Sequence, residues 1–455
     1  MKHVHLIGIG GTGISSIARV LLEQGYTVTG SDRILSPLAL DLRAQGVKVF
    51  AGHDAQNIAD ADVVVRSSAI PDTNVEVIAA RQAGIPVLKR SDFLGSLLAG
   101  HAGIAVAGSS GKTTTTSLMA FSLARLGLDP SYIIGGVSKD LAGNAHAGQG
   151  DFFVIEADEY DRMFMGLNPS VILLTSVEYD HPDCFPTPAI YLQAFGDFIR
   201  TLQPDGLLIA SPDYPHTSEL LAFAPASARI LTYGLSQGSD FRALQVQPND
   251  HGGIDFTVEF HGAPICQVSL QIPGEHNVRN SLAVLAALHA LGFSVEAAAR
   301  NLAGFSGIGR RFEVVGEARG ITVVDDYAHN PSKIAAALSA SRARYPGRRL
   351  VAVWQPHTYS RTKALAADFI SALAAADVTV VTEVYAAREP LEAFSSAELV
   401  QKMAGTESFY CRTLDDTVAF LEKKLIPGDV LLVLSAGDAD QVCTRVLHAL
   451  QERKN

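Results

Sequence analysis

Residues 104–116 (IAVAGSSGKTTTT) combine the residue types that can hold a phosphate. An apolar run leads into a glycine turn, and a lysine and four threonines follow at the start of a helical pattern. Glycines let backbone N–H groups approach an anion, and a helix start carries a partial positive charge. We expect Lys112 to reach nucleotide phosphates and the hydroxyl of Thr113 or Thr114 to bind Mg²⁺. The core motif is Gly108-Ser109-Ser110-Gly111-Lys112-Thr113, and the alternative is an ordinary glycine-rich connection.

A second glycine turn stands near the start of the chain, as Gly8-Ile9-Gly10-Gly11-Thr12-Gly13. It follows an apolar run and precedes a helical pattern, and Asp32 comes about twenty residues later, as in a dinucleotide-binding turn. Such a turn can hold a diphosphate at a helix start, with Asp32 on a ribose. A nicotinamide dinucleotide and a UDP-sugar are both candidates. The alternative is a turn that serves only close packing of strand against helix, because this motif is weak by itself.

Carboxylates gather where two further apolar runs end. The first run ends in Glu156-Ala157-Asp158-Glu159 and the second in Asp180-His181. We expect both groups to lie beside the phosphate loop, because parallel strands carry their ligands at one edge of a sheet. Glu156 and His181 are therefore candidate metal ligands opposite the nucleotide phosphates. The alternatives are a solvated acidic loop and a structural histidine.

Polar residues later in the chain could close the site from other sides. Asn277 and Asn280 stand at an expected helix start, where amides could recognise a purine edge or cap the helix. Further candidates follow residue 310 at strand ends, and they are Arg311, Asp326, Tyr327, His329 and Arg361. Arginines at such places can neutralise a transferring phosphoryl group. Together these residues predict a third wall over a nucleotide, although each alone could belong to a surface loop.

Length and composition describe a multidomain protein with an acidic charge balance. The 455 residues exceed one hydrophobic core, and no apolar run is long enough to span a membrane. The net charge of −11, without a basic cluster, argues against nucleic acid as a partner. Four scattered cysteines without a CxxC pair argue against a disulfide framework or a zinc site. We expect a cytoplasmic protein, because the first residues enter a strand without the regions of a signal peptide.

Apolar runs and helical patterns alternate along most of the chain, which predicts an α/β fold with parallel sheets. We expect three domains. Residues 1–100 would be Rossmann-like, 101–310 an ATPase-like parallel sheet around the phosphate loop, and 311–455 Rossmann-like again. Residues 229–272 show short alternating runs separated by turns, which predicts an antiparallel extension of the central sheet.

These motifs, in this order, resemble the Mur ligase family nearly from end to end. The segments that carry the resemblance are GIGGTGISSIA, TGSD, SSAIPDTN, GIPVLKRSDFL, GKTTTT, EADEYD, DDYAH and QPHTYSRTK. The family consists of ATP-dependent amide-forming ligases of peptidoglycan synthesis. The resemblance therefore implies γ-phosphoryl transfer from ATP to a substrate carboxylate, followed by attack of an amine on the acyl phosphate. Within the family, QPHTYSRTK and GIGGTGISSIA are most similar to the branch that adds L-alanine to UDP-N-acetylmuramate.

The resemblance also implies roles for individual residues. ATP and Mg²⁺ would be held by Gly108, Ser109, Ser110, Gly111, Lys112, Thr113, Thr114, Glu156, His181, Asn277, Asn280, Arg311 and Asp326, with Thr113, Glu156 and His181 on the metal. The UDP-sugar would be held by Gly8, Gly10, Gly11, Thr12, Gly13, Asp32, Ser67 and Ser68, and the reacting carboxylate and incoming amine would face Tyr327, His329 and Arg361. Catalysis would depend on Lys112, Glu156, His181, Arg311, His329 and Arg361. We expect a monomer or a weak homodimer.

Three places depart from the family pattern. Ser109-Ser110 stand where Thr-His is common, Ser176 where asparagine is common, and Asn330 where the alanine-adding branch usually has a second histidine. EADEYD and GEARGITVVDDYAH also resemble the recycling branch, which joins a tripeptide to UDP-N-acetylmuramate. Two hypotheses of other classes remain: an NAD(P)-dependent oxidoreductase built on the first glycine turn, and a nucleotide-gated switch without ligation chemistry.

Overall fold

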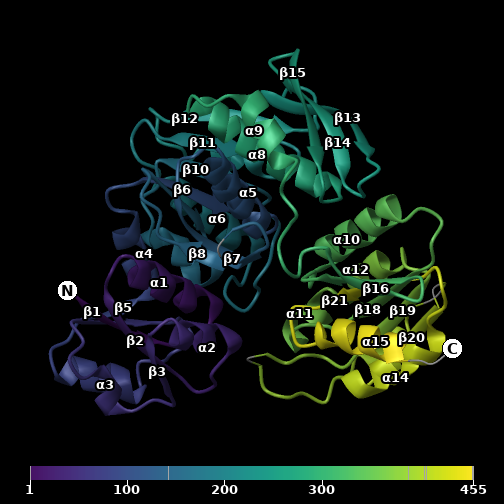
Figure 1. Ribbon diagram of the computed structural model, residues 1–455, viewed down its shortest axis with the longest axis horizontal. Coiled ribbons are helices and arrows are strands. Elements are labelled where there is room, and N and C mark those ends of the chain that lie inside the picture. The colour runs from purple at the N-terminus through teal and green to yellow at the C-terminus, as the bar shows by residue number, and fades with distance from the viewer. Residues whose placement is uncertain (1, 142, 388, 404, 406, 453–455) are drawn as a thin grey trace.

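The chain folds as an α/β protein with three separate sheets, seen in a computed structural model (Figure 1). The structure describes residues 2–452 except 142, 388, 404 and 406. The strands between residues 3 and 89 belong to an N-terminal domain, those between 102 and 270 to a central domain, and those between 313 and 434 to a C-terminal domain. This confirms the predicted α/β class, whereas the boundaries at residues 100 and 310 stay predictions. No helix in the described ranges is long and apolar enough to cross a bilayer.

The N-terminal domain has a five-stranded parallel sheet. Its strands are β1 (His3–Ile7), β2 (Thr27–Asp32), β3 (Lys48–Ala51), β4 (Val63–Arg66) and β5 (Val87–Lys89), and its helices are α1 (Thr12–Glu23), α2 (Pro37–Ala44), α3 (Val75–Gln82) and α4 (Arg90–Leu98), with a 3₁₀ turn at Ala55–Ile58. The strand order is β3-β2-β1-β4-β5. Because β1 lies in the centre, the glycine turn that follows it opens between the ends of β2 and β4, which is the usual place for a ligand in such sheets.

The central domain carries a ten-stranded sheet. Its strands are β6 (Ala102–Ala107), β7 (Ser131–Ser138), β8 (Gly143–His146), β9 (Phe152–Glu156), β10 (Val171–Leu174), β11 (Leu207–Ala210), β12 (Arg229–Gly234), β13 (Phe241–Pro248), β14 (Ile254–Phe260) and β15 (Ala263–Leu270). Its helices are α5 (Lys112–Arg125), α6 (Pro188–Ile199), α7 (Thr217–Leu221), α8 (Glu275–Ala290) and α9 (Val295–Leu302), with a 3₁₀ segment η2 at Tyr160–Gly166. In the order β15-β14-β13-β12-β11-β10-β6-β9-β7-β8, strand β6 lies between β10 and β9. The acidic strand ends therefore flank the phosphate loop, as predicted.

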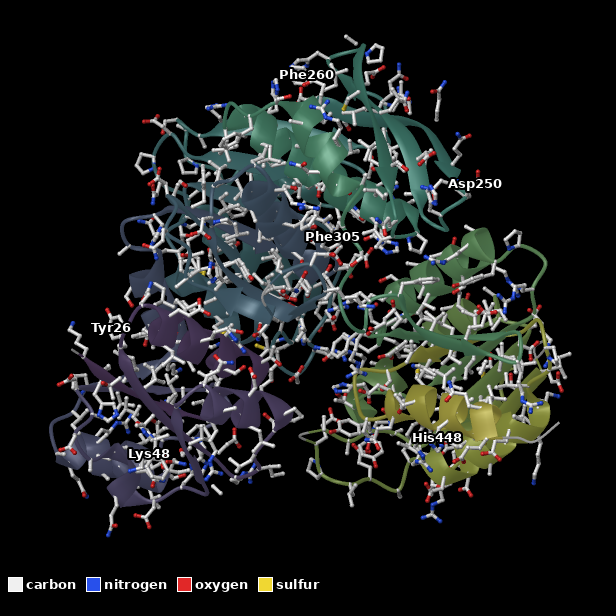
Figure 2. The ribbon with its side chains drawn as sticks, in the orientation of Figure 1. Tyr26, Lys48, Asp250, Phe260, Phe305 and His448 are labelled. Atoms are coloured by element: carbon white, nitrogen blue, oxygen red, sulfur yellow. The ribbon has the colours of Figure 1, made fainter. Side chains whose placement is uncertain are left out.

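The predicted antiparallel extension is correct for β13, β14 and β15 but wrong for the first of its four runs. β12 pairs in parallel with β11 and, through two residues, in parallel with β13. β14 is antiparallel to both of its neighbours. In Figure 2, Asp250 labels the turn before β14, and Phe260 labels the last residue of β14. The alternating pattern in residues 229–235 is typical of a half-exposed strand, whether its neighbours are parallel or antiparallel. Periodicity alone therefore could not decide how this strand pairs.

The C-terminal domain has a six-stranded sheet covered on both faces. Its strands are β16 (Glu313–Ala318), β17 (Ile321–Asp326), β18 (Leu350–Trp354), β19 (Val378–Thr382), β20 (Glu407–Cys411) and β21 (Val430–Leu434), and its helices are α10 (Pro331–Arg344), α11 (Tyr359–Ala364), α12 (Ala366–Leu373), α13 (Ala397–Val400), α14 (Leu414–Lys424) and α15 (Gln441–Glu452). The order is β16-β17-β21-β18-β19-β20, with only β16 antiparallel. Helices α10 and α12 cover one face, and α14 and α15 the other (Figure 1). Helices α11 and α12 follow one another directly and are separated at Leu365.

The three domains are joined in different ways. One apolar cluster runs continuously from the N-terminal into the central domain and includes Leu94 and Leu97 of α4 together with Phe164 and Phe198. The two apolar clusters of the C-terminal domain are built from residues 312 onward. Its described contacts with the central domain are polar ones, such as Lys139 Nζ to Glu313 Oε1 at 2.9 Å. The placement of the C-terminal domain therefore depends on charged groups more than on apolar burial.

Candidate active site

The phosphate loop runs from the end of β6 to the start of α5. Gly108 and Gly111 have φ angles of +142° and +84°, a range that favours glycine. A Cβ atom on Gly108 would lie 2.0 Å from Thr175 Oγ1, so no side chain fits at this position. The loop therefore turns tightly against β10 and ends at the N-terminus of α5, the arrangement that presents backbone N–H groups to a phosphate.

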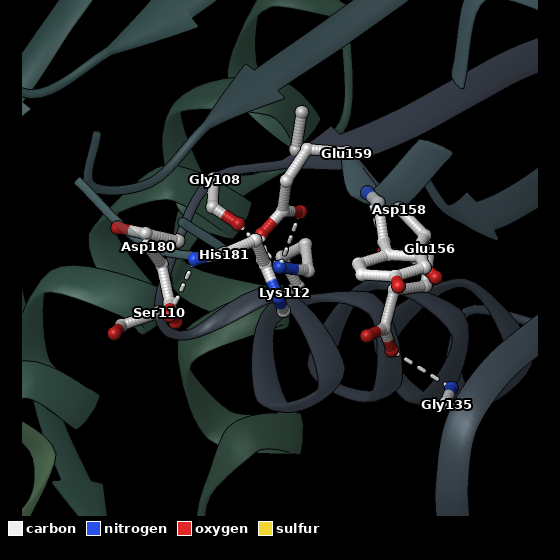
Figure 3. Close-up of polar contacts among 12 residues, drawn as sticks. Gly108, Ser110, Lys112, Gly135, Glu156, Asp158, Glu159, Asp180 and His181 are labelled. Atoms are coloured by element: carbon white, nitrogen blue, oxygen red, sulfur yellow. Dashed lines mark hydrogen bonds and ion pairs between the residues drawn. The ribbon is translucent and has the colours of Figure 1, made fainter. Parts of the chain in front are cut away.

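Lys112 lies at the centre of the site (Figure 3). Its ammonium group donates to the carbonyl oxygen of Gly108 at 2.5 Å and to Glu159 Oε2 at 2.7 Å. Burial works against the charge of Lys112, but Glu159, Asp158 and Glu156 together raise its pKa. Burial likewise works against the charge of Glu159, yet Lys112 and His181 lower its pKa to about 2. Both groups are thus ionised, and a phosphate would compete with Glu159 for the lysine.

The serines that depart from the family pattern contact one another. Ser109 donates its backbone N–H to the carbonyl oxygen of Ser176 at 2.7 Å, and Ser110 donates its own to Ser176 Oγ at 3.2 Å. The Ser109 hydroxyl also accepts from the backbone N–H of Glu178 at 2.9 Å. These serines, which are far apart in the sequence, therefore form one hydrogen-bonded set. The set holds the phosphate loop against the end of β10.

The candidate metal ligands divide into two groups. Thr113 donates to Glu156 Oε1 at 3.1 Å, and the other oxygen of Glu156 accepts from Gly135 N at 2.7 Å. His181 contacts a different carboxylate, with its Nε2 3.6 Å from Glu159 Oε1. Within the described chain, no three His, Cys, Asp or Glu side chains converge as a ready-made metal site. Burial, and to a lesser degree the neighbouring Asp158, raises the pKa of Glu156, which fits a carboxylate that gains from a nearby cation.

Asn277 and Asn280 lie in the first two turns of helix α8, near the expected helix start. Helix α8 begins at Glu275 with Gly274 at the N-cap position, so the alternative of Asn277 as the cap is wrong. Gly274 has φ +98°, a value that favours glycine. Asn277 donates to the carbonyl oxygen of Pro273 at 2.7 Å, and Asn280 donates to Asn277 Oδ1 at 3.1 Å. A Cβ atom on Gly111 would lie 2.6 Å from Asn280 Oδ1, so this amide borders the phosphate loop.

Arg311 reaches the central domain from the first residues of the C-terminal domain. Its guanidinium donates to Thr113 Oγ1 at 3.3 Å and lies over the ring of Tyr327. Asp326, at the end of β17, accepts from the backbone N–H groups of Phe312 and Ala328, each at 2.8 Å. Asp326 therefore holds together the two loops that carry Arg311 and Tyr327.

Asp180 links the central domain to a second region of the C-terminal domain, around Arg361. The sequence analysis did not single out Asp180 as a functional residue. It is buried, and its Oδ1 accepts from Arg361 Nη2 at 2.8 Å, across 181 positions of sequence. Burial would raise the pKa of Asp180, but Lys333 and Arg361 hold it far below its ordinary value. His329 lies close by, with Nδ1 2.8 Å from the carbonyl oxygen of Tyr327. Burial, Lys333 and Arg361 keep the pKa of His329 well below its usual range, so this imidazole is neutral.

The N-terminal glycine turn is a separate part of the site. Asp32 Oδ2 accepts from Gly10 N at 2.9 Å, so this carboxylate braces the turn. Gly8 has φ +86°, and a Cβ there would lie 3.0 Å from Ser67 Cβ, which places Ser67 against the turn, whereas Ser68 is exposed. A Cβ atom on Gly13 would lie 1.5 Å from Arg90 Nη1. The glycine at 13 thus admits a guanidinium to the start of α1.

Arg90 connects this turn with the acidic segment that follows β9, and the sequence analysis missed it. Its Nη2 lies 3.3 Å from Asp158 Oδ2, and its Nε contacts Met163 Sδ. A cation beside the positive end of a helix is unfavourable by itself, so its position fits a site that receives an anion. The only sequence signal was a single arginine at a helix start within GIPVLKRSDFL.

Models of three protein-family domains match the chain. The match to the Mur ligase family, catalytic domain, covers residues 3–102, that to the Mur ligase middle domain 106–288, and that to the Mur ligase, glutamate ligase domain, 310–437. Full-length relatives carry the name UDP-N-acetylmuramate–L-alanine ligase. One from Caldanaerobacter subterraneus is 40% identical over 98% of this chain and 97% of its own, and one from Kineococcus radiotolerans is 43% identical over 100% and 97%.

Solved structures give the same picture. The crystal structure of UDP-N-acetylmuramate-alanine ligase from Thermotoga maritima superposes with a TM-score of 0.85 at 29% identity, with complete coverage of both chains. A murein peptide ligase from Psychrobacter arcticus superposes with a TM-score of 0.73 at 28% identity, also with complete coverage. The sequence motifs, the three sheets and these matches lead to one conclusion: the chain belongs to the Mur ligase family.

Proposed function

We propose that this protein joins L-alanine to the carboxylate of UDP-N-acetylmuramate at the expense of ATP, a step in peptidoglycan precursor synthesis. The observation that carries the proposal is that cations from two domains contact the residues beside the phosphate loop: Lys112 contacts Glu159, Arg311 contacts Thr113 and Arg361 contacts Asp180. The names of the full-length relatives support the same substrates. A cluster of cations that faces acidic strand ends suits phosphoryl transfer, because the cations can neutralise phosphate charge. Hydride transfer does not require such a cluster.

The chemistry follows from the weakness of a carboxylate as an electrophile. The carboxylate oxygen attacks the γ-phosphorus of ATP, the bond to the bridging oxygen breaks, and ADP leaves. The amine of L-alanine then attacks the acyl carbon, the bond to the phosphate oxygen breaks, and the amine loses a proton. The protein contributes by positioning the reactants and by neutralising negative charge.

The described contacts support a role for each cation. Lys112 would bind the β- and γ-phosphates from the phosphate loop, and Arg311 would neutralise charge beside Thr113. Arg361 would face the reacting carboxylate. His329, neutral and buried in the same junction, would face the incoming amine.

Mg²⁺ fits the oxygen ligands at the start of α5. The hydroxyl of Thr113 and the carboxylate of Glu156 are already in contact, and hard oxygen ligands of this kind suit Mg²⁺. When bound, the ion would neutralise phosphate charge. His181 is a candidate for a second position beside Glu159. We propose that Asn277 and Asn280 contact the adenine side of the nucleotide.

The UDP-sugar would lie at the N-terminal glycine turn. The turn from Gly8 to Gly13, braced by Asp32 and bordered by Ser67, offers a helix start to the diphosphate. The continuous apolar cluster between the first two domains would keep this turn at a constant distance from the phosphate loop. We further propose that the reaction takes place in the cytoplasm, by a monomer or weak homodimer.

A substrate screen tests the proposal. We expect ADP to form rapidly only when ATP, Mg²⁺, UDP-N-acetylmuramate and L-alanine are all present, and mass spectrometry should detect the alanyl product. Replacing L-alanine with glycine, L-serine or the tripeptide of the recycling branch measures specificity. ATP turnover that ignores both substrates would contradict the proposal, and preference for the tripeptide would assign the recycling reaction instead. Tight NADH binding would revive the oxidoreductase hypothesis.

A further inference from the structure

Lys333 occupies a special place in the junction between the central and C-terminal domains. It lies in the first turn of α10, which Asn330 caps by accepting the backbone N–H of Lys333 at 3.0 Å. Pro331 fixes the first helical position, so the direction of this turn is well determined. The lysine side chain is only 17% exposed. An ordinary first-turn lysine would extend into solvent, because a helix start disfavours cations.

The nearest carboxylate does not satisfy Lys333. Asp180 Oδ2 is 3.8 Å from the ammonium nitrogen, beyond the range of a hydrogen bond. Asp180 already accepts from Arg361 at 2.8 Å, from the backbone N–H of His181 at 2.8 Å and from Asn330 at 3.4 Å. Of these four groups, Lys333 therefore has the longest contact with Asp180.

Two other cations lie close enough to Lys333 to act on its charge. Burial is the main cause that lowers the pKa of Lys333 to about 8, and Lys112 and Arg311 lower it further, although Asp180 and Glu159 oppose them. Lys333 and Arg361 in turn suppress the protonation of His329. An ammonium group enclosed among like charges is costly unless an anion shares the space. A transferring phosphoryl group is such an anion, since its charge spreads over three oxygens.

We propose that Lys333 is a further catalytic residue, whose ammonium donates hydrogen bonds to the phosphoryl group as it passes from ATP to the substrate carboxylate. The proposal rests on the ligase function proposed above. Lys333 keeps its protons throughout: the phosphorus–oxygen bond to ADP breaks, the bond to the carboxylate oxygen forms, and the lysine only neutralises the charge of the group in transit. In the protein without bound nucleotide, the ammonium group of Lys333 lies beside Asp180 without a hydrogen bond to it.

The test uses the full-length protein and the variants Lys333→Met, Lys333→Gln and Lys333→Arg. The matched control is Lys139→Met, because Lys139 also joins the central and C-terminal domains, through Glu313 at 2.9 Å, but lies outside the site. We expect Lys333→Met and Lys333→Gln to lower kcat by about 10²-fold, with less than a threefold change in KM for ATP. Lys333→Arg should keep a kcat of at least a tenth of the wild-type value. Lys139→Met should have the kcat of the wild type.

A binding measurement separates this role from a structural one. ADP alone should bind the wild type and Lys333→Met equally. ADP with aluminium fluoride, Mg²⁺ and UDP-N-acetylmuramate, which imitates the transferring phosphoryl group, should bind Lys333→Met about 100-fold more weakly. Equal affinity for this mixture, or an equal loss in Lys139→Met, would overturn the proposal. A wild type that forms no ADP with the two substrates would instead overturn the ligase function.

Discussion

Glu76 is the buried carboxylate behind the N-terminal glycine turn. It is fully enclosed and accepts from Ser31 Oγ at 2.5 Å and from Asn57 Nδ2 at 2.7 Å, with His53 Nδ1 at 3.2 Å. The carbonyl oxygen of Ser31 accepts the backbone N–H of Gly8 at 2.8 Å. The carboxylate therefore stabilises the strand end on which the turn rests, and Glu76→Gln should weaken both folding and UDP-sugar binding.

The pKa of Glu76 sets the magnitude of this effect. Burial would raise the pKa of Glu76, but His5, Ser31 and Asn57 lower it from 4.5 to about 2. At about 1.4 kcal/mol for each tenfold change in affinity for the proton, this difference corresponds to about 3 kcal/mol of folding free energy. Because the pKa is lower in the folded state, the contribution is complete above pH 4.5 and disappears as the pH falls toward 2.

Urea unfolding, followed by far-UV circular dichroism, measures the effect. The fluorescence of Trp354 is unsuitable, because this single tryptophan lies in the C-terminal domain. We expect Glu76→Gln to lower the free energy of unfolding by about 3 kcal/mol at pH 7, with a smaller difference below pH 4.5. The control is Asp41→Asn, which removes an exposed carboxylate paired with Arg19 in the same domain and should cost under about 1 kcal/mol.

Two outcomes would refute this reasoning. A difference between wild type and Glu76→Gln that stays constant as the pH falls from 7 to about 3 would mean that the carboxylate charge does not stabilise the fold. If Glu76→Gln and Asp41→Asn lowered the free energy of unfolding equally, burial and hydrogen bonding would not make Glu76 more stabilising than an exposed carboxylate.

Three other predictions concern the phosphate site. Lys112→Ala should reduce ADP formation by at least about 10²-fold, measured in a coupled assay, whereas a nucleotide-gated switch would mainly lose nucleotide affinity. Gly108→Ala should abolish binding of a fluorescent ATP analogue and lower the melting temperature, because the new Cβ would lie 2.0 Å from Thr175 Oγ1; unchanged binding would show that the loop can move away. If Lys333 must be charged, kcat/KM should fall as the pH rises through about 8, where Lys333 loses its proton, and Lys333→Arg should move this decline to higher pH.

Local chemistry explains why much of the site could be predicted from the sequence. The positions of the glycines in both turns and of the hydroxyls in α5 follow from the local sequence. A strand, a turn and a helix start are each formed by consecutive residues. The acidic ends of β9 and β10 were placed beside the loop because parallel strands carry their ligands at one edge of a sheet. The alternative of Asn277 as a helix cap was wrong, because Gly274 occupies the N-cap position of α8.

The sequence by itself determined the glycine turn between β6 and α5, the α/β class and the family, because these depend on short segments whose residue types have few other uses. Only the tertiary structure decided that Asp180 holds Arg361 across 181 positions, that Arg90 lies over Gly13, and that Lys333 turns inward beside its like charges. The physical reason is that electrostatic contacts depend on distance in space and on burial. Neither quantity exists until the domains have packed against one another.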